Sequence, residues 1–163
     1  MKYKQYQEDL NKILESEIFG EALFSTAAKQ TKSQIKKQKW LTLAALESQT
    51  LDRLEVFLQQ NQLKATSRFH MKAQGIALGY VLSKLPWSVA MYLVKDGTQP
   101  FMQVFERLCA HADQNSNSFF EYVLNHEKSI HEFANRELKK QDSASLEMVL
   151  ALLEQPKSSS LKS

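Results

Sequence analysis

The stretch NHEKSIHEF, residues 125–133, places acids and imidazoles inside a predicted helix that covers residues 118–139. A helix turns by about 100° per residue, so Glu127 and His131 fall on one face, one turn apart. The same face carries four apolar side chains: Phe120, Val123, Ala134 and Leu138. A carboxylate and an imidazole are costly to bury without partners. The stretch therefore predicts an amphipathic helix whose buried side carries polar groups for a reason.

The first predicted helix, residues 6–29, repeats this arrangement. Glu17 and Glu21 fall at the centre of its apolar stripe, whereas Glu8 and Glu15 fall nearly opposite. A simple solvated run of charges is not expected to divide in this way. We therefore expect Glu17 and Glu21 inside the protein and Glu8 and Glu15 in water.

The second predicted helix, residues 36–60, does the same with one acid. Glu47 lies at the centre of its apolar face, and Thr50 lies at the edge. That face is made by Trp40, Leu43, Leu51, Leu54 and Leu58. The basic run at residues 36–39 is expected to be the solvated start of the helix. Three helices thus each place carboxylates on a buried face.

The chain from Glu55 to Asp96 has no acidic residue between these two ends. Within it, the spacing of Gly75 and Gly79 predicts a close approach between two helices. Pro86 is expected to break the segment into a buried third helix and a continuation. A membrane span is not expected, because Lys84 and Pro86 would fall in its middle.

The C-terminal half is predicted to contain further short elements. Residues 97–100, Gly-Thr-Gln-Pro, predict a turn, followed by a short helix over 101–112. Asp142 is expected to cap a last helix over 144–154. The whole is predicted to be one domain, 1–155, with a disordered tail over 156–163.

Composition limits the classes of protein that the chain can represent. Its 163 residues are 43% hydrophobic and 24% charged, as in an ordinary globular domain, and only four Gly and three Pro favour long helices. The net charge of +3 is too small to indicate nucleic-acid binding. Cys109 is the single cysteine and the N-terminus is polar. We therefore expect a cytoplasmic protein without disulfides or a secretory signal.

The four inward carboxylates and His131 predict a metal site. Four negative charges would be balanced by two divalent metal ions, and oxygen ligands with one imidazole suit iron or manganese. At this point the chain resembles the ferritin-like superfamily of carboxylate-bridged di-iron proteins, over residues 6–138. The matching residues are Glu17, Glu21, Glu47, Glu127 and His131.

The resemblance implies an antiparallel four-helix bundle with extra short helices, holding two iron ions per chain, or manganese, that activate oxygen or peroxide. The pattern also departs from the family. Where the family has Glu-x-x-His, this chain has Glu47-x-x-Thr50 and Glu127-x-x-Ile130. The third helix supplies no acid. Thr50 could hold a bound water beside the metal.

A second hypothesis is a metal-free bundle that binds a protein or an apolar ligand. Its contact surface would be the acid-free segment 70–94, with Gly75, Gly79, Trp87 and Met91. Attachment to a membrane surface is a third reading. The remaining histidines, His70, His111 and His126, are interpreted as surface residues. The sequence is compatible with a homodimer and indicates neither a substrate nor a redox partner.

Overall fold

The computed structural model describes residues 3–156, which form six helices and no strand. The helices are α1 (Tyr3–Gln30), α2 (Gln34–Gln60), α3 (Met71–Lys84), α4 (Trp87–Ala110), α5 (Asn117–Leu138) and α6 (Glu147–Leu153). The predicted all-α class is confirmed. No described helix has the length and hydropathy needed to cross a bilayer. The predicted tail falls outside the described residues, apart from the exposed Pro156.

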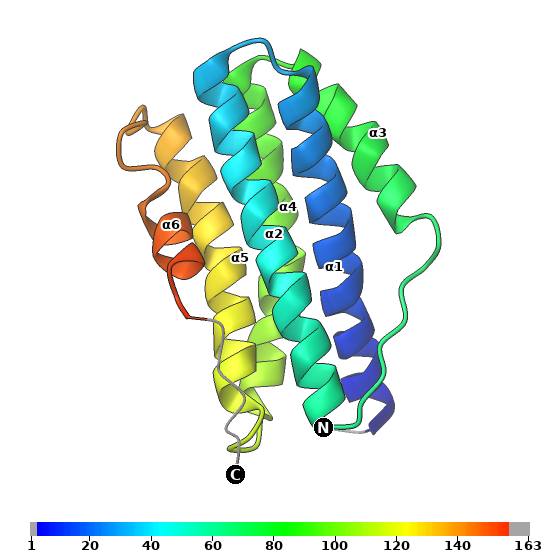
Figure 1. Cartoon of the computed structure of the whole chain (residues 1–163). Helices are drawn as coiled ribbons and strands as arrows, with labels where there is room; N and C mark the ends of the chain where they lie inside the picture. Colours follow the sequence, from blue (N-terminus) through cyan, green and yellow to red (C-terminus); the bar gives the residue numbers. More distant parts are fainter. Residues whose placement is uncertain (1–2, 157–163) are drawn as a thin grey trace.

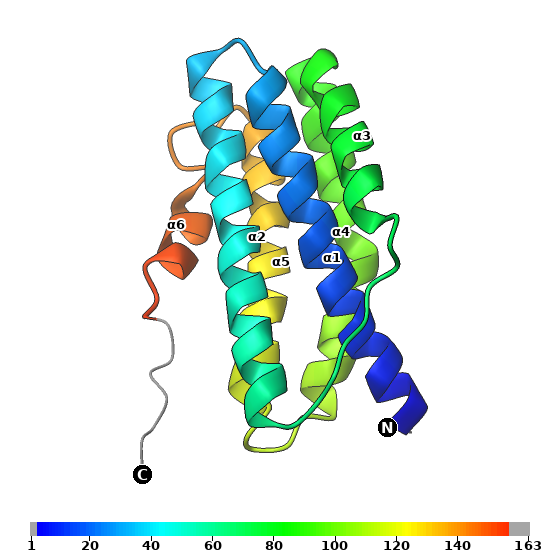
Figure 2. The same ribbon diagram turned by 45° about the vertical axis from the view of Figure 1, so that its right-hand side comes forward.

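The four long helices α1, α2, α4 and α5 lie side by side (Figures 1 and 2). Followed along the chain, α1 and α5 run one way and α2 and α4 run the other. Short turns join α1 to α2 and α4 to α5, while the connection between the two pairs runs along α1 and contains α3 (Figure 1). The buried side chains of Glu17, Glu47 and His126 lie between these two pairs.

Helix α3 packs closely on α1 through its two glycines. A Cβ added at Gly75 would lie 2.4 Å from the Phe19 carbonyl oxygen, and one at Gly79 would lie 2.3 Å from the Leu23 carbonyl oxygen. Since real Cβ atoms do not approach backbone this closely, only glycine permits this packing distance. The predicted close approach of two helices at these glycines is confirmed.

The predicted turn at residues 97–100 is wrong, because α4 runs through it without interruption. Pro100 removes one backbone hydrogen bond but does not end the helix. The Thr98 side chain donates a hydrogen bond to the Lys95 carbonyl, and Val94 and Phe105 on either side are buried. Tertiary packing therefore holds the helix where local propensity predicts a break.

Two acids away from the predicted seam are also buried, and each has a cation. Asp9 is fully buried and accepts two hydrogen bonds, of 2.8 and 2.9 Å, from Arg107. Glu15, predicted to lie in water, is buried instead and accepts hydrogen bonds from the side chain and backbone of Arg68. That prediction failed because the connection between α2 and α3 covers this side of α1. The prediction that Glu8 is exposed is confirmed.

The basic run at the start of α2 is only partly solvated. Lys39 is buried and pairs with Glu137 of α5, which also accepts a 2.7 Å hydrogen bond from the Trp87 indole nitrogen. This contact joins three helices near one end of the molecule. Such a buried pair satisfies both charges, and it explains why an inward lysine occurs in a run predicted to be solvated.

Two further predictions are corrected. Asp142 does not cap the last helix, since α6 begins only at Glu147 and has no side-chain cap. The acid-free segment does not present its predicted contact residues either. Gly75, Gly79 and Met91 are buried, and Trp87 is half-buried against Trp40 with ring centroids 5.0 Å apart. Helix α3 buries its glycines because α1 lies against them.

Replacement of Gly79 by alanine is expected to lower the free energy of unfolding by about 1–3 kcal/mol, because the new methyl overlaps the α1 backbone. Gly97 is the matched control, because a Cβ there meets nothing within 4 Å. Gly97→Ala is expected to be neutral or to stabilise by up to about 1 kcal/mol. Urea unfolding measures both variants. Equal effects of the two substitutions would contradict the close packing of α3 on α1.

Candidate metal centre

Three buried side chains from three helices meet between the two helix pairs: Glu17 of α1, Glu47 of α2 and His126 of α5. One ligand atom from each lies within 4.8 Å of the other two. The His126 Nε2 atom lies 3.4 Å from Glu47 Oε2 and 3.7 Å from Glu17 Oε2. Glu17 and His126 are fully buried, and Glu47 is 4% exposed. We call these three residues the Glu–Glu–His cluster.

Thr50 fixes the orientation of the imidazole in this cluster. The Thr50 hydroxyl donates to the Leu46 carbonyl at 3.0 Å, and its oxygen lies 2.6 Å from His126 Nδ1. When the hydroxyl donates its one proton to Leu46, a neutral imidazole with its hydrogen on Nδ1 can donate that hydrogen to Thr50. The lone pair is then on Nε2, which faces the two carboxylates. Thr50 thus gives His126 the tautomer of a metal ligand.

Gly20 gives Glu47 the room to reach the cluster. A Cβ at Gly20 would lie 2.4 Å from Glu47 Oε1 and 2.5 Å from its carboxyl carbon. Gly20 lies on α1, one turn after Glu17, so the α2 carboxylate passes over the bare backbone of α1. Because Gly20 has no side chain, the carboxyl of Glu47 has space to approach that of Glu17.

Two polar atoms of the cluster have no partner in the protein, whereas Glu17 Oε1 accepts a hydrogen bond from Ser16. Glu17 Oε2 and His126 Nε2 are buried and have no hydrogen-bond partner. In residues 3–156, no lysine or arginine forms an ion pair with Glu17, Glu47 or Glu127. Arg68 pairs with Glu15 on the same helix as Glu17. Buried polar atoms without partners are rare and call for an explanation, such as a bound ion.

Burial disfavours the charged form of each carboxyl in the site. It raises the pKa of Glu17 and Glu47 well above 4.5, and that of Glu127 to about 8. The carboxylates also repel one another: Glu47 raises the pKa of Glu17, and Glu127 raises the pKa of Glu47. His126 acts in the opposite direction on Glu17 and Glu127. Without a cation, Glu127 therefore holds a proton at neutral pH, and the protonated forms of Glu17 and Glu47 are favoured by burial.

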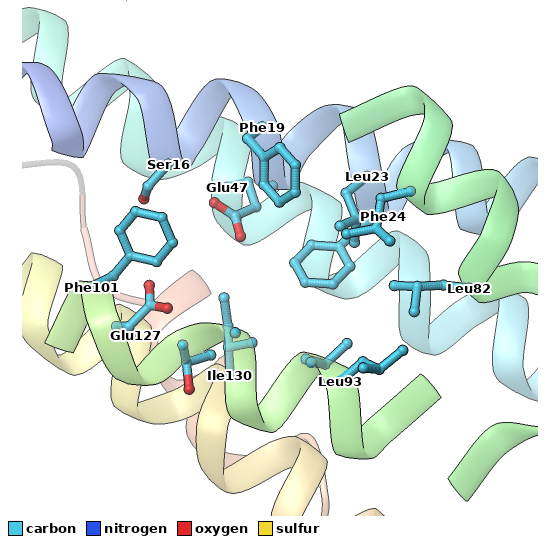
Figure 3. A pocket seen from close by; sticks show the side chains of 15 residues that line it. Ser16, Phe19, Leu23, Phe24, Glu47, Leu82, Leu93, Phe101, Glu127 and Ile130 are labelled. Atoms are coloured by element: carbon cyan, nitrogen blue, oxygen red, sulfur yellow. The ribbon is translucent and has the colours of Figure 1, made fainter. Parts of the chain in front are cut away.

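Glu127 lies beside the cluster, on the wall of a cavity of about 100 Å³. Figure 3 shows the carboxyl groups of Glu47 and Glu127 pointing toward one another from α2 and α5. The remaining wall is mostly apolar and comes from α1, α3, α4 and α5. It includes Phe19, Leu23, Phe24, Leu82, Val94, Phe101 and Ile130. The site thus has two parts, the polar Glu–Glu–His cluster and an apolar cavity next to its carboxylates.

The five predicted ligands do not all lie in the Glu–Glu–His cluster. Glu17 and Glu47 are in the cluster, and Glu127 is next to it. Glu21 is half-buried and outside the cluster, although its charge raises the pKa of Glu47. His131 is half-buried, and its Nδ1 lies 2.9 Å from Thr98 Oγ1 and 3.2 Å from the Lys95 carbonyl. Metal binding by any of these residues stays a prediction.

The expectation that His126 is a surface residue is wrong, and His126 is the imidazole of the cluster. This prediction failed for a geometric reason. The buried arc of α5 is wide and is centred between His126 and Glu127, because α2, α4 and α6 all pack against α5. Tyr122, one turn before His126, is also buried and approaches Thr50. The sequence signal for the burial of His126 is its spacing of four residues from Tyr122, which places both side chains on the same face of α5.

Comparison of the chain with models of known protein families, with curated proteins and with solved structures gave no match. A divalent cation fits the donor set, because two or three carboxylates and one imidazole with a free lone pair are suitable ligands for iron or manganese. The cation would also give Glu17 Oε2 and His126 Nε2 the partner that they lack.

The raised pKa of Glu127 predicts how stability depends on pH in chelator-treated protein. Its folded-state pKa, about 8, exceeds the ordinary value of 4.5. Between these values the folded state binds more protons than the unfolded state, so the free energy of unfolding falls as pH rises. Glu127→Gln should make this fall shallower, whereas the exposed control Glu55→Gln should not change it. Urea midpoints from pH 5 to pH 8.5 measure the slope. Stability that rises over this range would contradict burial of protonated acids.

Proposed function

We propose that this chain is a non-haem metal protein in which the Glu–Glu–His cluster binds one divalent iron or manganese ion and activates oxygen or peroxide. One observation carries the proposal. Glu17 Oε2 and His126 Nε2 lie 3.7 Å apart, fully buried, with no hydrogen-bond partner. An ion between them would remove the cost of leaving both groups unpaired.

The bundle is proposed to be of ferritin-like type. Two observations support this assignment: α1 and α5 run opposite to α2 and α4, and a single long connection, which contains α3, joins α2 to α4 (Figure 1). Ferritin-like bundles have one long crossover and build their metal sites from inward side chains of facing helices. The cluster likewise takes its ligands from α1, α2 and α5.

Although Thr50 and Ile130 stand where the family pattern has histidines, His126 can supply the imidazole of a metal site. Position 50, where Glu-x-x-His would place an imidazole on α2, holds a threonine that orients the imidazole of α5 instead. The ligands would be Glu17, Glu47 and His126, with Glu127 available as a fourth. We propose one ion per chain rather than two, because Glu21 and His131 are outside the cluster.

The protein would contribute orientation and exclusion of water. A bound iron or manganese would supply Lewis-acid and redox chemistry. Thr50 holds the imidazole hydrogen on Nδ1, and Gly20 lets Glu47 reach the cluster. Glu127, on the cavity wall, can hold or release a proton facing a molecule in the cavity.

The alternative function, a metal-free binding module, is favoured by a different observation. Helices α3 and α4 expose large apolar side chains, and Phe69, just before α3, is 98% exposed. The exposed residues on α3 and α4 are Ile76, Leu78, Tyr80, Val81, Val89, Tyr92 and Leu93. An apolar surface of this kind is typical of a contact site. A measurement of metal binding distinguishes the two functions, because a metal protein binds iron and a metal-free binding module does not.

The two histidines of α5, five residues apart in the sequence, provide a matched pair of variants. Protein purified without chelator and incubated anaerobically with ferrous ion is expected to hold about one iron per chain, since one cluster binds one ion. His126→Gln should lose that iron, whereas His131→Gln should keep it, because His131 pairs with Thr98 outside the cluster. Plasma mass spectrometry after gel filtration measures the content.

The opposite pattern, with iron lost only in His131→Gln, would show that the ligands are those predicted from the sequence. No iron in the wild-type chain would overturn the metal proposal. Where iron is retained, the wild-type protein is expected to consume oxygen or hydrogen peroxide faster than His126→Gln. Equal rates would leave a metal site without the proposed activity.

Thr50 offers a test of how the imidazole is held. Thr50→Val keeps the shape of the side chain but removes the hydroxyl that accepts the His126 hydrogen. Affinity for manganese(II) is expected to fall by about 10–100-fold, the usual effect of losing a group that orients a metal ligand. Thr50→Ser, which restores the hydroxyl, should recover most of the affinity. Electron paramagnetic resonance of free manganese(II) measures it. Unchanged affinity in Thr50→Val would contradict the role of Thr50.

A further inference from the structure

The cavity beside Glu47 and Glu127 is open to the surface between α3 and α4. Leu78 of α3 and Leu93 of α4 line the cavity, and they are 38% and 44% exposed. Gly97 of α4 also lines it, and a Cβ there would meet nothing within 4 Å. A small molecule therefore has a route from the exposed apolar side chains of α3 and α4 to the carboxyl groups.

The wall of the cavity determines what kind of molecule fits. Apart from Ser16, Thr98 and the two carboxyl groups, the side chains of the wall are aliphatic or aromatic. The volume, about 100 Å³, is somewhat smaller than the roughly 150 Å³ of an apolar cavity known to bind benzene or xenon. A ring or chain end about the size of benzene fits this space, with any larger part of the ligand directed outward between Leu78 and Leu93.

Charge also disfavours anionic ligands. Among the residues that line the cavity there is no basic side chain, and the acidic ones are Glu47 and Glu127. An anion would find no cation there and would face two acids. Neutral apolar groups lose nothing by entering.

We propose that this cavity is a binding site for a small apolar ligand, a single ring or a short hydrocarbon end, which enters between α3 and α4 and lies against Glu47 and Glu127. The inference goes beyond the proposed metal chemistry, because the cavity exists whether or not the cluster binds an ion. If both are correct, the ligand would lie beside the metal ligands, as a substrate must.

Benzene is the probe, added to chelator-treated protein and followed by nuclear magnetic resonance of the side-chain methyl groups. Saturable binding is expected, with Overhauser contacts from benzene to the methyls of Leu82, Val94 and Ile130. Val94→Phe fills the cavity and Gly97→Phe covers its mouth, and each should weaken binding by about tenfold or more. Leu150→Phe, an exposed position on α6 outside the cavity, is the matched control and should bind as the wild type does.

Gly97→Phe keeps the test valid if Val94→Phe does not fold, because nothing lies close to position 97. Absence of saturable binding in the wild-type protein would overturn the proposal. Binding that is unchanged in the folded cavity variants would also overturn it. Phosphatidylcholine vesicles distinguish the source of the ligand. Sedimentation of the wild-type protein with the vesicles, lost in Gly97→Phe, indicates a lipid chain, and benzene binding without sedimentation indicates a free small molecule.

Metal binding is measured separately, so the two proposals fail independently. Loss of iron binding in His126→Gln with benzene binding retained is expected, since His126 does not line the cavity.

Discussion

The hydrogen bond between Thr50 and His126 is the contact on which the rest of the site depends. It joins α2 to α5, and with the imidazole hydrogen on Nδ1 it leaves the lone pair of Nε2 facing Glu17 and Glu47. A single turn of α2 supplies both Glu47 and Thr50, so one helix provides a proposed ligand and positions another. The Glu–Glu–His cluster is therefore built by the packing of α2 against α5, with Gly20 of α1 leaving the space for Glu47.

The buried acids of the protein fall into two groups, with and without a basic partner. Asp9, Glu15 and Glu137 each have a basic partner, Arg107, Arg68 and Lys39. The acids of the site have none, and they share their space with one another and with His126. Burial of these acids either favours protonation or leaves a charge unpaired, and both outcomes cost free energy, so the acids destabilise the metal-free protein. A bundle selected only for stability would have apolar residues at these positions, which favours a functional origin for the cluster.

The sequence predicted much of this arrangement because a 3.6-residue period records which face of a helix is buried. The all-α class, α1, α2, α5, the buried Glu17, Glu47 and Glu127, and the close approach at Gly75 and Gly79 followed from spacing alone. Spacing could not give His126, because several neighbours widen the buried arc of α5 beyond one stripe. Nor could it give the unbroken α4, in which tertiary contacts around Pro100 outweigh local propensity, or the Glu15–Arg68 pair, which joins residues 53 positions apart.

The location of a bound metal tests the account most directly. A crystal of iron-loaded protein, measured at the iron absorption edge, would show the ion by anomalous scattering. One peak per chain is expected, within coordination distance of His126 Nε2 and of carboxylate oxygens from Glu17 and Glu47. A peak coordinated by His131 instead, or no peak in protein exposed to excess ferrous ion, would contradict it.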